Sequence, residues 1–124
     1  DLQMSDLPDA WNEGMETLLG IKPPTDREGC LQDIHWYDGA WGYFPTYTLG
    51  AMTAAQLFAK AKTEKPEILE SITKGNFKPL MSWLKMNVHS KGCSLSTKDL
   101  ITIATGEPLN AKFFKSHLQN RYLN

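Results

Sequence analysis

One histidine stands in the most unusual stretch of the sequence, GCLQDIHWYDGAWGYFPTYTLG at positions 29–50. Asp33 comes two residues before His35, and a carboxylate at that distance is suited to orient an imidazole ring. Tyr43 and Tyr47 follow the histidine by eight and twelve residues. A phenol stays protonated at neutral pH, so it can donate a hydrogen bond to a developing oxyanion. The residue types therefore favour oxyanion stabilisation or substrate binding by His35 together with a tyrosine.

The same residues also fit a buried aromatic cluster. The stretch holds two Trp, three Tyr and one Phe, and the polar tips of buried aromatic side chains commonly find hydrogen-bond partners. Gly39, Gly42 and Gly50 allow tight turns or a close approach of the backbone. On residue types alone, the functional and the structural interpretations both stay open.

The other histidines and the cysteines do not indicate a metal site. His89 and His117 lie far apart in the sequence, whereas recognisable zinc ligands come in close pairs, as in HExxH. Cys30 and Cys93 form neither a CxxC motif nor a disulfide-rich pattern. We predict that this chain alone binds no metal, and that both cysteines are reduced thiols of a cytoplasmic protein.

Charge and hydropathy argue against nucleic-acid and membrane partners. The 124 residues carry a formal net charge of −1, with a pI of about 6.3 and scattered lysines and arginines. Proteins that bind nucleic acids normally present a basic face. No run of the sequence approaches the roughly 18 apolar residues that a membrane span needs. We therefore expect no nucleic acid and no membrane among the partners.

Helical periodicity predicts the elements that position the aromatic stretch. Helices are expected at 7–19, 48–62, 66–74, 77–91, 97–105 and 111–122. Gly20, Gly92 and Gly106 are expected to end helices, and Ser96 and Asn110 to cap them.

The clearest apolar stripe lies in the fourth of these segments, and its members are Phe77, Leu80, Met81, Leu84 and Val88. No segment shows the alternation of a strand. The predicted fold class is all-α, a bundle of six to seven helices in a single domain over 1–124.

The aromatic stretch also carries a family signature. Residues 29–36, GCLQDIHW, match the GxxQDxHW motif of the carboxypeptidase Taq family of zinc metallocarboxypeptidases, which this chain therefore resembles. GYFPTYTLGAMTAAQ at 42–56 is similar to the next block of that family. LPDAWNEGMETLLGI with its Pro-rich loop, and the tail with ATGEPLNAKFF and RYLN, are similar as well. The resemblance covers essentially the whole chain.

The resemblance implies a longer, nearly all-helical enzyme that is usually a homodimer. In that family, zinc is held by HExxH and a downstream Glu, and an IRxxAD block supplies an Arg for the substrate carboxylate. This sequence has no HExxH, HES or IRxxAD. We therefore expect it to be the C-terminal part of a helical zincin-like fold. It is expected to be inactive alone and to need the upstream catalytic part, with its zinc or other divalent metal, as a partner.

The resemblance also implies roles for individual residues. In related helical zinc peptidases, a His and a Tyr twelve residues later face the zinc-bound oxygen, and His35 and Tyr47 have that spacing. These two are expected to be catalytic, donating hydrogen bonds to the oxyanion when the last bond at a peptide's C-terminus is attacked. The residues expected to orient His35 or to bind substrate are Tyr43, Gln32, Asp33 and Trp36. Tyr43 stays open as the alternative donor.

Two functions without catalysis remain as alternatives: a stand-alone helical module that binds peptides, and a dimerisation module. A gene that continues upstream through HExxH would favour the peptidase, whereas an initiator Met just before Asp1 would favour a module. Under the peptidase interpretation, the surface that faces the upstream part is exposed. Exposed apolar surface of this kind favours assembly into a homo-oligomer.

Overall fold

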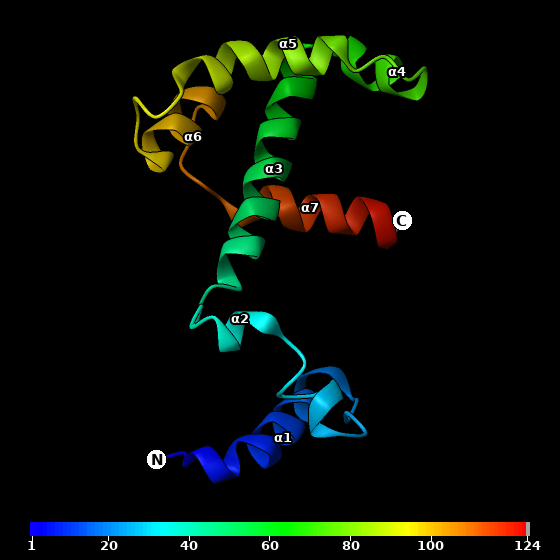
Figure 1. The fold of residues 1–124 in the computed structure, drawn as a ribbon. Coiled ribbons are helices and arrows are strands. Elements are labelled where there is room, and N and C mark those ends of the chain that lie inside the picture. The colour runs from blue at the N-terminus through cyan, green and yellow to red at the C-terminus, as the bar shows by residue number, and fades with distance from the viewer. Residues whose placement is uncertain (124) are drawn as a thin grey trace. The chain divides into compact units, whose positions relative to one another are not determined.

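The computed structural model describes residues 1–123, and within that range it confirms the all-α fold class, with seven α-helices, three short 3-10 helices and no strand. The α-helices are α1 (Leu7–Leu19), α2 (Ile34–Tyr37), α3 (Pro45–Glu64), α4 (Glu67–Thr73), α5 (Lys78–Asn87), α6 (Thr97–Thr105) and α7 (Ala111–Tyr122) (Figure 1). The chain forms two compact units, Asp1–Tyr43 and Phe44–Asn124. The expectation of a single domain stays a prediction.

The first unit consists of a short 3-10 helix (Met4–Asp6), α1, a loop and the single turn of α2. α1 ends where the sequence predicts, because Gly20 adopts a φ of 71° and its N–H donates to the Glu16 carbonyl at 2.9 Å. The loop holds a 3-10 helix, Asp26–Glu28. A Cβ on Gly29 would lie 3.2 Å from the Cβ of Pro23, so only glycine lets the backbone pass there without a shift.

The first unit buries little apolar surface. Within residues 1–43, all of which are described, Gly29 and Cys30 are the fully buried residues. Its large apolar side chains that remain exposed are Leu2, Met4, Leu18, Leu19, Ile21, Leu31, Ile34, Tyr37, Trp41 and Tyr43. A segment of this length rarely gains enough from burial to fold stably by itself. The local hydrogen bonds of the unit therefore matter more than its core.

The second unit is assembled around α3, which contacts α4, α5, α6 and α7 (Figure 1). The chain leaves α3 at Lys65, as expected from Lys65-Pro66. Its core is the buried cluster of Ala61, Ile68 and Trp83. The partly buried side chains around that cluster are Leu57, Phe58, Ile72, Leu80 and Leu84.

The predicted stripe on α5 is correct only in its centre. Leu80 and Leu84 pack on the core, but Met81 is 50% exposed and Phe77, the N-cap residue, is 54% exposed. Trp83, which lies outside the stripe, is the buried residue of the helix. The reason is its indole N–H, which donates to the Glu64 carboxylate at 2.7 Å and so turns this face of α5 toward α3.

The end of α5 also differs from the expectation. The α-helix stops at Asn87, and a 3-10 helix, His89–Lys91, continues to Gly92. Gly92 has a φ of 52° and thus ends the 3-10 helix rather than α5.

The predicted ends of α6 and the predicted start of α7 are confirmed, whereas α3 begins at Pro45 and ends at Glu64 instead of spanning 48–62. The Ser96 hydroxyl accepts from the Asp99 N–H at 3.1 Å and donates to the Asp99 carboxylate at 2.6 Å at the start of α6. Gly106 ends α6 with a φ of 92°. The Asn110 side chain accepts from the Lys112 N–H at 3.0 Å at the start of α7.

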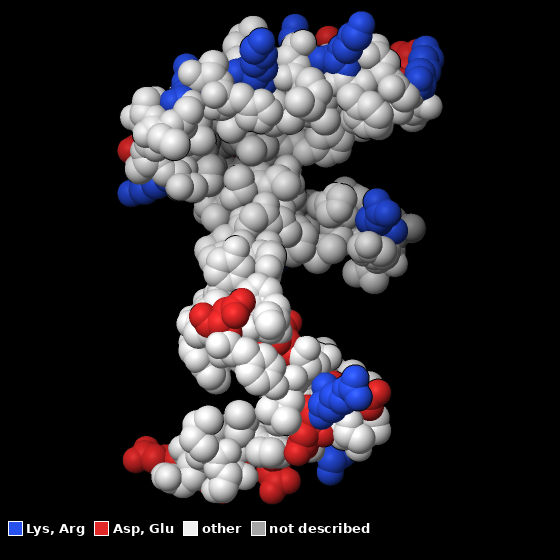
Figure 2. Space-filling view, viewed as in Figure 1, with Lys and Arg blue, Asp and Glu red and all other residues white. Residues whose placement is uncertain are grey.

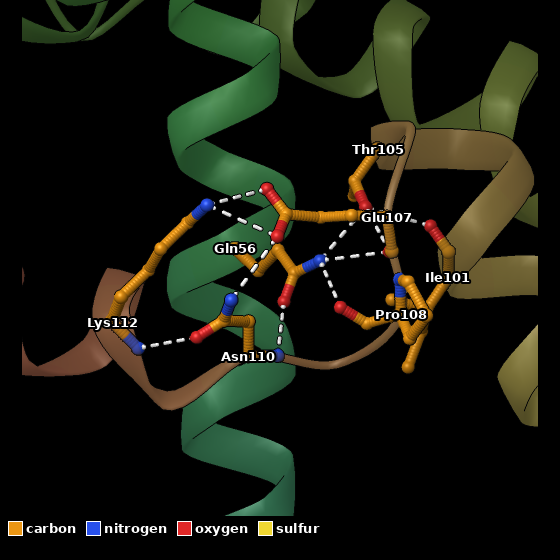
Figure 3. Close-up of polar contacts among 7 residues, drawn as sticks. All are labelled: Gln56, Ile101, Thr105, Glu107, Pro108, Asn110 and Lys112. Carbon is orange, nitrogen blue, oxygen red and sulfur yellow. Dashed lines mark hydrogen bonds and ion pairs between the residues drawn. The ribbon is translucent and has the colours of Figure 1, made fainter.

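A buried amide connects α3 to the link between α6 and α7 (Figure 3). Gln56 is fully buried, and its Nε2 lies 2.8 Å from Thr105 Oγ1 and 3.1 Å from the carbonyl oxygens of Glu107 and Pro108. Its Oε1 accepts from the Asn110 N–H at 2.8 Å. One side chain therefore contacts the Thr105 hydroxyl at the end of α6 and satisfies backbone groups of the link and of the start of α7.

The charged side chains of α4 and α5 lie in separate groups, with uncharged residues between them on the face that Figure 2 shows. A continuous basic surface, which nucleic-acid binding would favour, is not seen on that face. None of the described helices is both long and apolar enough to cross a membrane.

Replacing the buried amide should destabilise the second unit. In Gln56→Leu, the Asn110 N–H and the Pro108 carbonyl lose the partner that the amide supplies, whereas the Glu107 carbonyl keeps the Thr105 hydroxyl at 3.0 Å. We expect the free energy of unfolding, measured by urea titration, to fall by about 2 to 3 kcal/mol. Gln119→Leu, the same change at an exposed position of α7, should shift it by less than about 0.5 kcal/mol. Equal effects of the two changes would contradict the role of Gln56.

The Glu64 carboxylate should make stability depend on acid pH. The Trp83 hydrogen bond, and then Lys60 Nζ at 3.1 Å, hold the pKa of Glu64 below its ordinary value. Its stabilising effect is therefore present above the pKa of an unfolded-state glutamate, about 4.3, and is lost as the pH falls through the lower folded-state pKa. We expect Glu64→Gln to be less stable than wild type at neutral pH, with the gap closing in acid.

The matched variant Lys60→Met removes the weaker partner only. It should shift the acid dependence in the same direction as Glu64→Gln, by a smaller amount. A gap between Glu64→Gln and wild type that stays constant from neutral pH to the acid transition would rule out this linkage.

Candidate functional site

Asp33 and His35 form the centre of the candidate site. Asp33 is the N-cap of α2, with an extended backbone, and its Oδ1 accepts from the backbone N–H of His35 at 2.8 Å. The same oxygen lies 2.6 Å from His35 Nδ1. These two contacts hold the pKa of the Asp33 carboxyl below its usual range, with the backbone hydrogen bond as the larger cause. The ring is therefore oriented by an ionised carboxylate.

Tyr43 packs on the imidazole. The ring centroids of His35 and Tyr43 are 5.4 Å apart, and their planes differ by 20°, which is a stacked arrangement. The turn that brings Tyr43 there uses Gly39 and Gly42, both at a φ of 74°. A hydrogen bond from the Ala40 N–H to the His35 carbonyl, at 2.8 Å, closes it. The structure thus brings together three of the predicted site residues: Asp33, His35 and Tyr43.

Trp36 is part of an apolar pocket in the same unit. Its ring meets Trp11 edge-on at a centroid distance of 5.0 Å and an angle of 75°. The pocket has a volume of about 200 Å³. Its lining consists of Met4, Leu7, Trp11, Cys30, Leu31, Trp36, Tyr37 and Trp41. Trp36 therefore faces apolar neighbours, whereas His35 is held by a carboxylate and a tyrosine.

Gln32 lies in the loop just before α2 and is exposed. Its backbone N–H donates to the Gly29 carbonyl at 3.2 Å, which closes the turn between the buried Gly29 and the cap of α2. Gly29 and Gln32, the first and fourth residues of the GxxQDxHW motif, thus determine the path of the backbone that leads to His35.

Tyr47 belongs to the second unit, in the first turn of α3. Its N–H donates to the Phe44 carbonyl at 3.0 Å, and its ring meets Phe44 edge-on at 5.9 Å. Its side chain is largely exposed, with 57% of the residue accessible. The pairing of His35 with Tyr47 stays a prediction, as do the roles assigned to the site residues.

The next feature is the distribution of side chains that could ligate a metal. Among residues 1–123, no group of three or more His, Cys, Asp or Glu is gathered around a common point. His89 lies in the 3-10 helix after α5, and His117 lies on α7 near Phe114 and Phe58. The expectation that this chain alone binds no metal stays a prediction.

Sequence reasoning did not identify Trp11 or Tyr37 as part of this region. The Trp11 indole N–H is buried without a hydrogen-bond partner in the described chain, and the Tyr37 hydroxyl donates to the Leu31 carbonyl at 2.9 Å. Trp11 does lie on the apolar face that predicts α1. That pattern indicates that Trp11 is buried, but it does not indicate which aromatic side chain Trp11 contacts.

The arrangement offers an oriented imidazole with a carboxylate behind it and an aromatic ring on its face. Such a group can donate or accept one proton or hydrogen bond at its outer nitrogen. Hydrogen bonding to a substrate or to a reaction intermediate is the chemistry that this geometry supports.

Comparison with known proteins assigns the chain to a family. The sequence model described as carboxypeptidase Taq (M32) metallopeptidase matches residues 1–122. "Thermostable carboxypeptidase 1" of Pyrococcus furiosus is 42% identical over 99% of this chain, which corresponds to 25% of the relative. "Carboxypeptidase 1" of Bacillus subtilis is 44% identical over the whole chain and 25% of its own length.

Solved structures agree with this assignment. The structure titled "Trypanosoma Cruzi Metallocarboxypeptidase 1" superposes with a TM-score of 0.92 at 40% identity, over 99% of this chain and 26% of the other. An M32 carboxypeptidase from Deinococcus radiodurans gives a TM-score of 0.92 at 37% identity, over 98% and 24%. The chain thus spans about a quarter of the length of the relatives it matches.

Proposed function

This chain belongs to the carboxypeptidase Taq (M32) metallopeptidase family, and from that premise we propose that it is the C-terminal part of a metallocarboxypeptidase that releases amino acids from the C-terminal end of peptides. The observation that carries the proposal is the family match over residues 1–122, which includes the GxxQDxHW motif around His35. Zinc, or another divalent metal, is proposed as the cofactor of the upstream part. The isolated chain is proposed to be inactive.

The proposed catalytic residues are His35 and Tyr47. Each would donate a hydrogen bond to the oxyanion that develops on the carbonyl of the last peptide bond. Removing one such donor typically costs about 3 kcal/mol of transition-state stabilisation. The 2.6 Å contact with Asp33 and the stacked Tyr43 support this role for His35, because they fix the direction in which the ring points.

The remaining residues of the motif are proposed to form the wall of the substrate groove. Gln32 and Trp36 would line it, Asp33 would orient the imidazole, and Tyr43 is the alternative to Tyr47 as the second donor. The stacked geometry of Tyr43 supports packing as its first role, since its ring face is already engaged by His35.

The proposed partners are the C-terminus of a peptide, the upstream catalytic part and a second copy of the protein, with no nucleic acid and no membrane. The exposed apolar side chains of the first unit support a protein partner, because surfaces of this kind mark interaction sites. A cytoplasmic location is proposed as well, and it is supported by two cysteines that are both free thiols.

A chimera tests the proposed activity. This chain would replace the corresponding quarter of Bacillus subtilis Carboxypeptidase 1, to which it is 44% identical. We expect the chimera to release C-terminal residues from peptides and the isolated chain to release none. In the chimera, Tyr47→Phe should lower kcat on the order of 100-fold with KM nearly unchanged, as expected for loss of a transition-state donor.

Tyr122→Phe, at an exposed position of α7, is the matched control and should leave kcat unchanged. A folded chimera that fails to release C-terminal residues would argue against the function. Unchanged kcat in Tyr47→Phe would remove Tyr47 from the mechanism, and the same variant at Tyr43 would then test the alternative donor.

The exposed apolar residues should cause the isolated chain to associate. Leu18 is 82% exposed and Trp41 is 67% exposed. We expect sedimentation velocity to show dimers or larger species as the concentration rises toward the millimolar range. Combined Leu18→Gln and Trp41→Gln substitutions should shift the chain toward the monomer, because they reduce the apolar area that association would bury. A wild-type chain that stays monomeric at millimolar concentration would contradict this expectation.

A further inference from the structure

The carboxylate of Asp33 determines more than the direction of the imidazole. An ionised carboxylate has no proton and can only accept hydrogen bonds. A contact of 2.6 Å between its Oδ1 and His35 Nδ1 therefore requires the proton to lie on Nδ1. The lowered pKa of Asp33 agrees with an ionised acceptor at neutral pH.

We infer that Asp33 is a positioning residue that keeps the proton of the neutral His35 ring on Nδ1, so that Nε2 can donate a hydrogen bond only when the ring is an imidazolium. A neutral ring in this tautomer presents a lone pair at Nε2, which repels an oxyanion. If His35 donates a hydrogen bond to an oxyanion, its ring must therefore be cationic, and the Asp33 carboxylate compensates that charge. This last step rests on the proposed function, whereas the tautomer does not.

The alternative is that Asp33 serves only as a helix cap. The described chain offers a comparison, because Ser96 and Asn110 also cap helices through their side chains. Each of them accepts one backbone N–H, as Asp33 does with the 2.8 Å bond to the His35 N–H. Their further contacts are donated, by the Ser96 hydroxyl to the Asp99 carboxylate and by the Asn110 amide to the Glu107 carboxylate, so neither capping oxygen accepts a second time in the way that Asp33 Oδ1 does. Capping alone does not require the second, shorter contact of the same Asp33 oxygen with the ring.

The tautomer can be measured directly in this chain. Long-range ¹H–¹⁵N correlation spectra of the labelled protein distinguish the protonated from the unprotonated ring nitrogen. Above the pH at which the rings lose their charge, we expect His35 to be protonated mainly on Nδ1. His89 and His117, which make no hydrogen bond to a carboxylate in the described chain, are internal references and should favour Nε2–H, the ordinary preference of imidazole in water.

Two variants separate the effect on the ring from the effect on the cap. Asp33→Asn keeps a capping oxygen but offers an amide N–H₂ that can donate to Nδ1. Asp33→Ser keeps a capping hydroxyl on a shorter side chain. We expect both to shift His35 toward Nε2–H, with unchanged signals from His89 and His117. A wild-type His35 that is protonated on Nε2 when neutral, or that matches the two reference histidines, would overturn the inference.

The functional consequence is tested in the chimera described above. Asp33→Asn should lower kcat tenfold or more, on the order expected when the partner that orients a functional histidine is lost. His35→Gln should lower kcat further, and the double variant should equal His35→Gln, because Asp33 acts through the ring. Independent, multiplying losses would show that Asp33 does not act through His35. An inactive chimera, or full activity in His35→Gln, would count against the proposed function and leave the tautomer result intact.

Discussion

A buried amide must find partners for all of its polar atoms, and the second unit is arranged to meet that requirement at Gln56. An apolar residue in this position would fill space without preferring one placement of its neighbours. The amide instead fixes which atoms approach α3: Thr105 at the end of α6 and the Asn110 N–H at the start of α7. Because buried polar groups are stable only when fully satisfied, the two helices cannot slide along α3 without leaving a donor or acceptor unpaired. The helix held in this way also carries Tyr47 in its first turn, so the register of the unit and the place of a proposed site residue depend on the same contact.

The first unit is organised by different means. It has almost no buried apolar core, and its shape comes from short-range hydrogen bonds and one close backbone passage at Gly29. The GxxQDxHW motif supplies most of these features: a glycine where a Cβ would lie 3.2 Å from Pro23, an aspartate that begins α2, a histidine that the aspartate holds, and a tryptophan that packs on Trp11. The motif is therefore a unit of local structure as well as a set of functional groups. That explains how a segment with little core can still present an imidazole in a defined direction.

The sequence predicts a contact well when the two residues are close along the chain, and poorly when they come from different helices. Gly20, Ser96 and Asn110 act within one turn of the helices that they end or begin, and their roles could be read from their neighbours. The closeness of Asp33 and His35 is of the same kind, since only one residue separates them. The buried face of α5 could not be predicted, because it depends on Trp83 reaching Glu64 from another helix. The stack of Tyr43 on His35 depends on two left-handed glycines in the intervening turn, and spacing alone does not distinguish that turn from others.

The shared oxygen of Asp33 has a consequence for how position 33 tolerates change. One atom receives the N–H that begins α2 and the ring N–H of His35, so the position demands a short side chain and a negative charge at once. Glutamate keeps the charge, but its side chain is one methylene too long for the cap. Serine keeps the cap, but its hydroxyl does not reach the ring. Asparagine keeps the shape, but it carries no charge and its amide N–H₂ donates where a carboxylate accepts. Each substitution there thus removes at least one of two properties, the cap that begins α2 or the charge that faces the ring, and no other residue type supplies both.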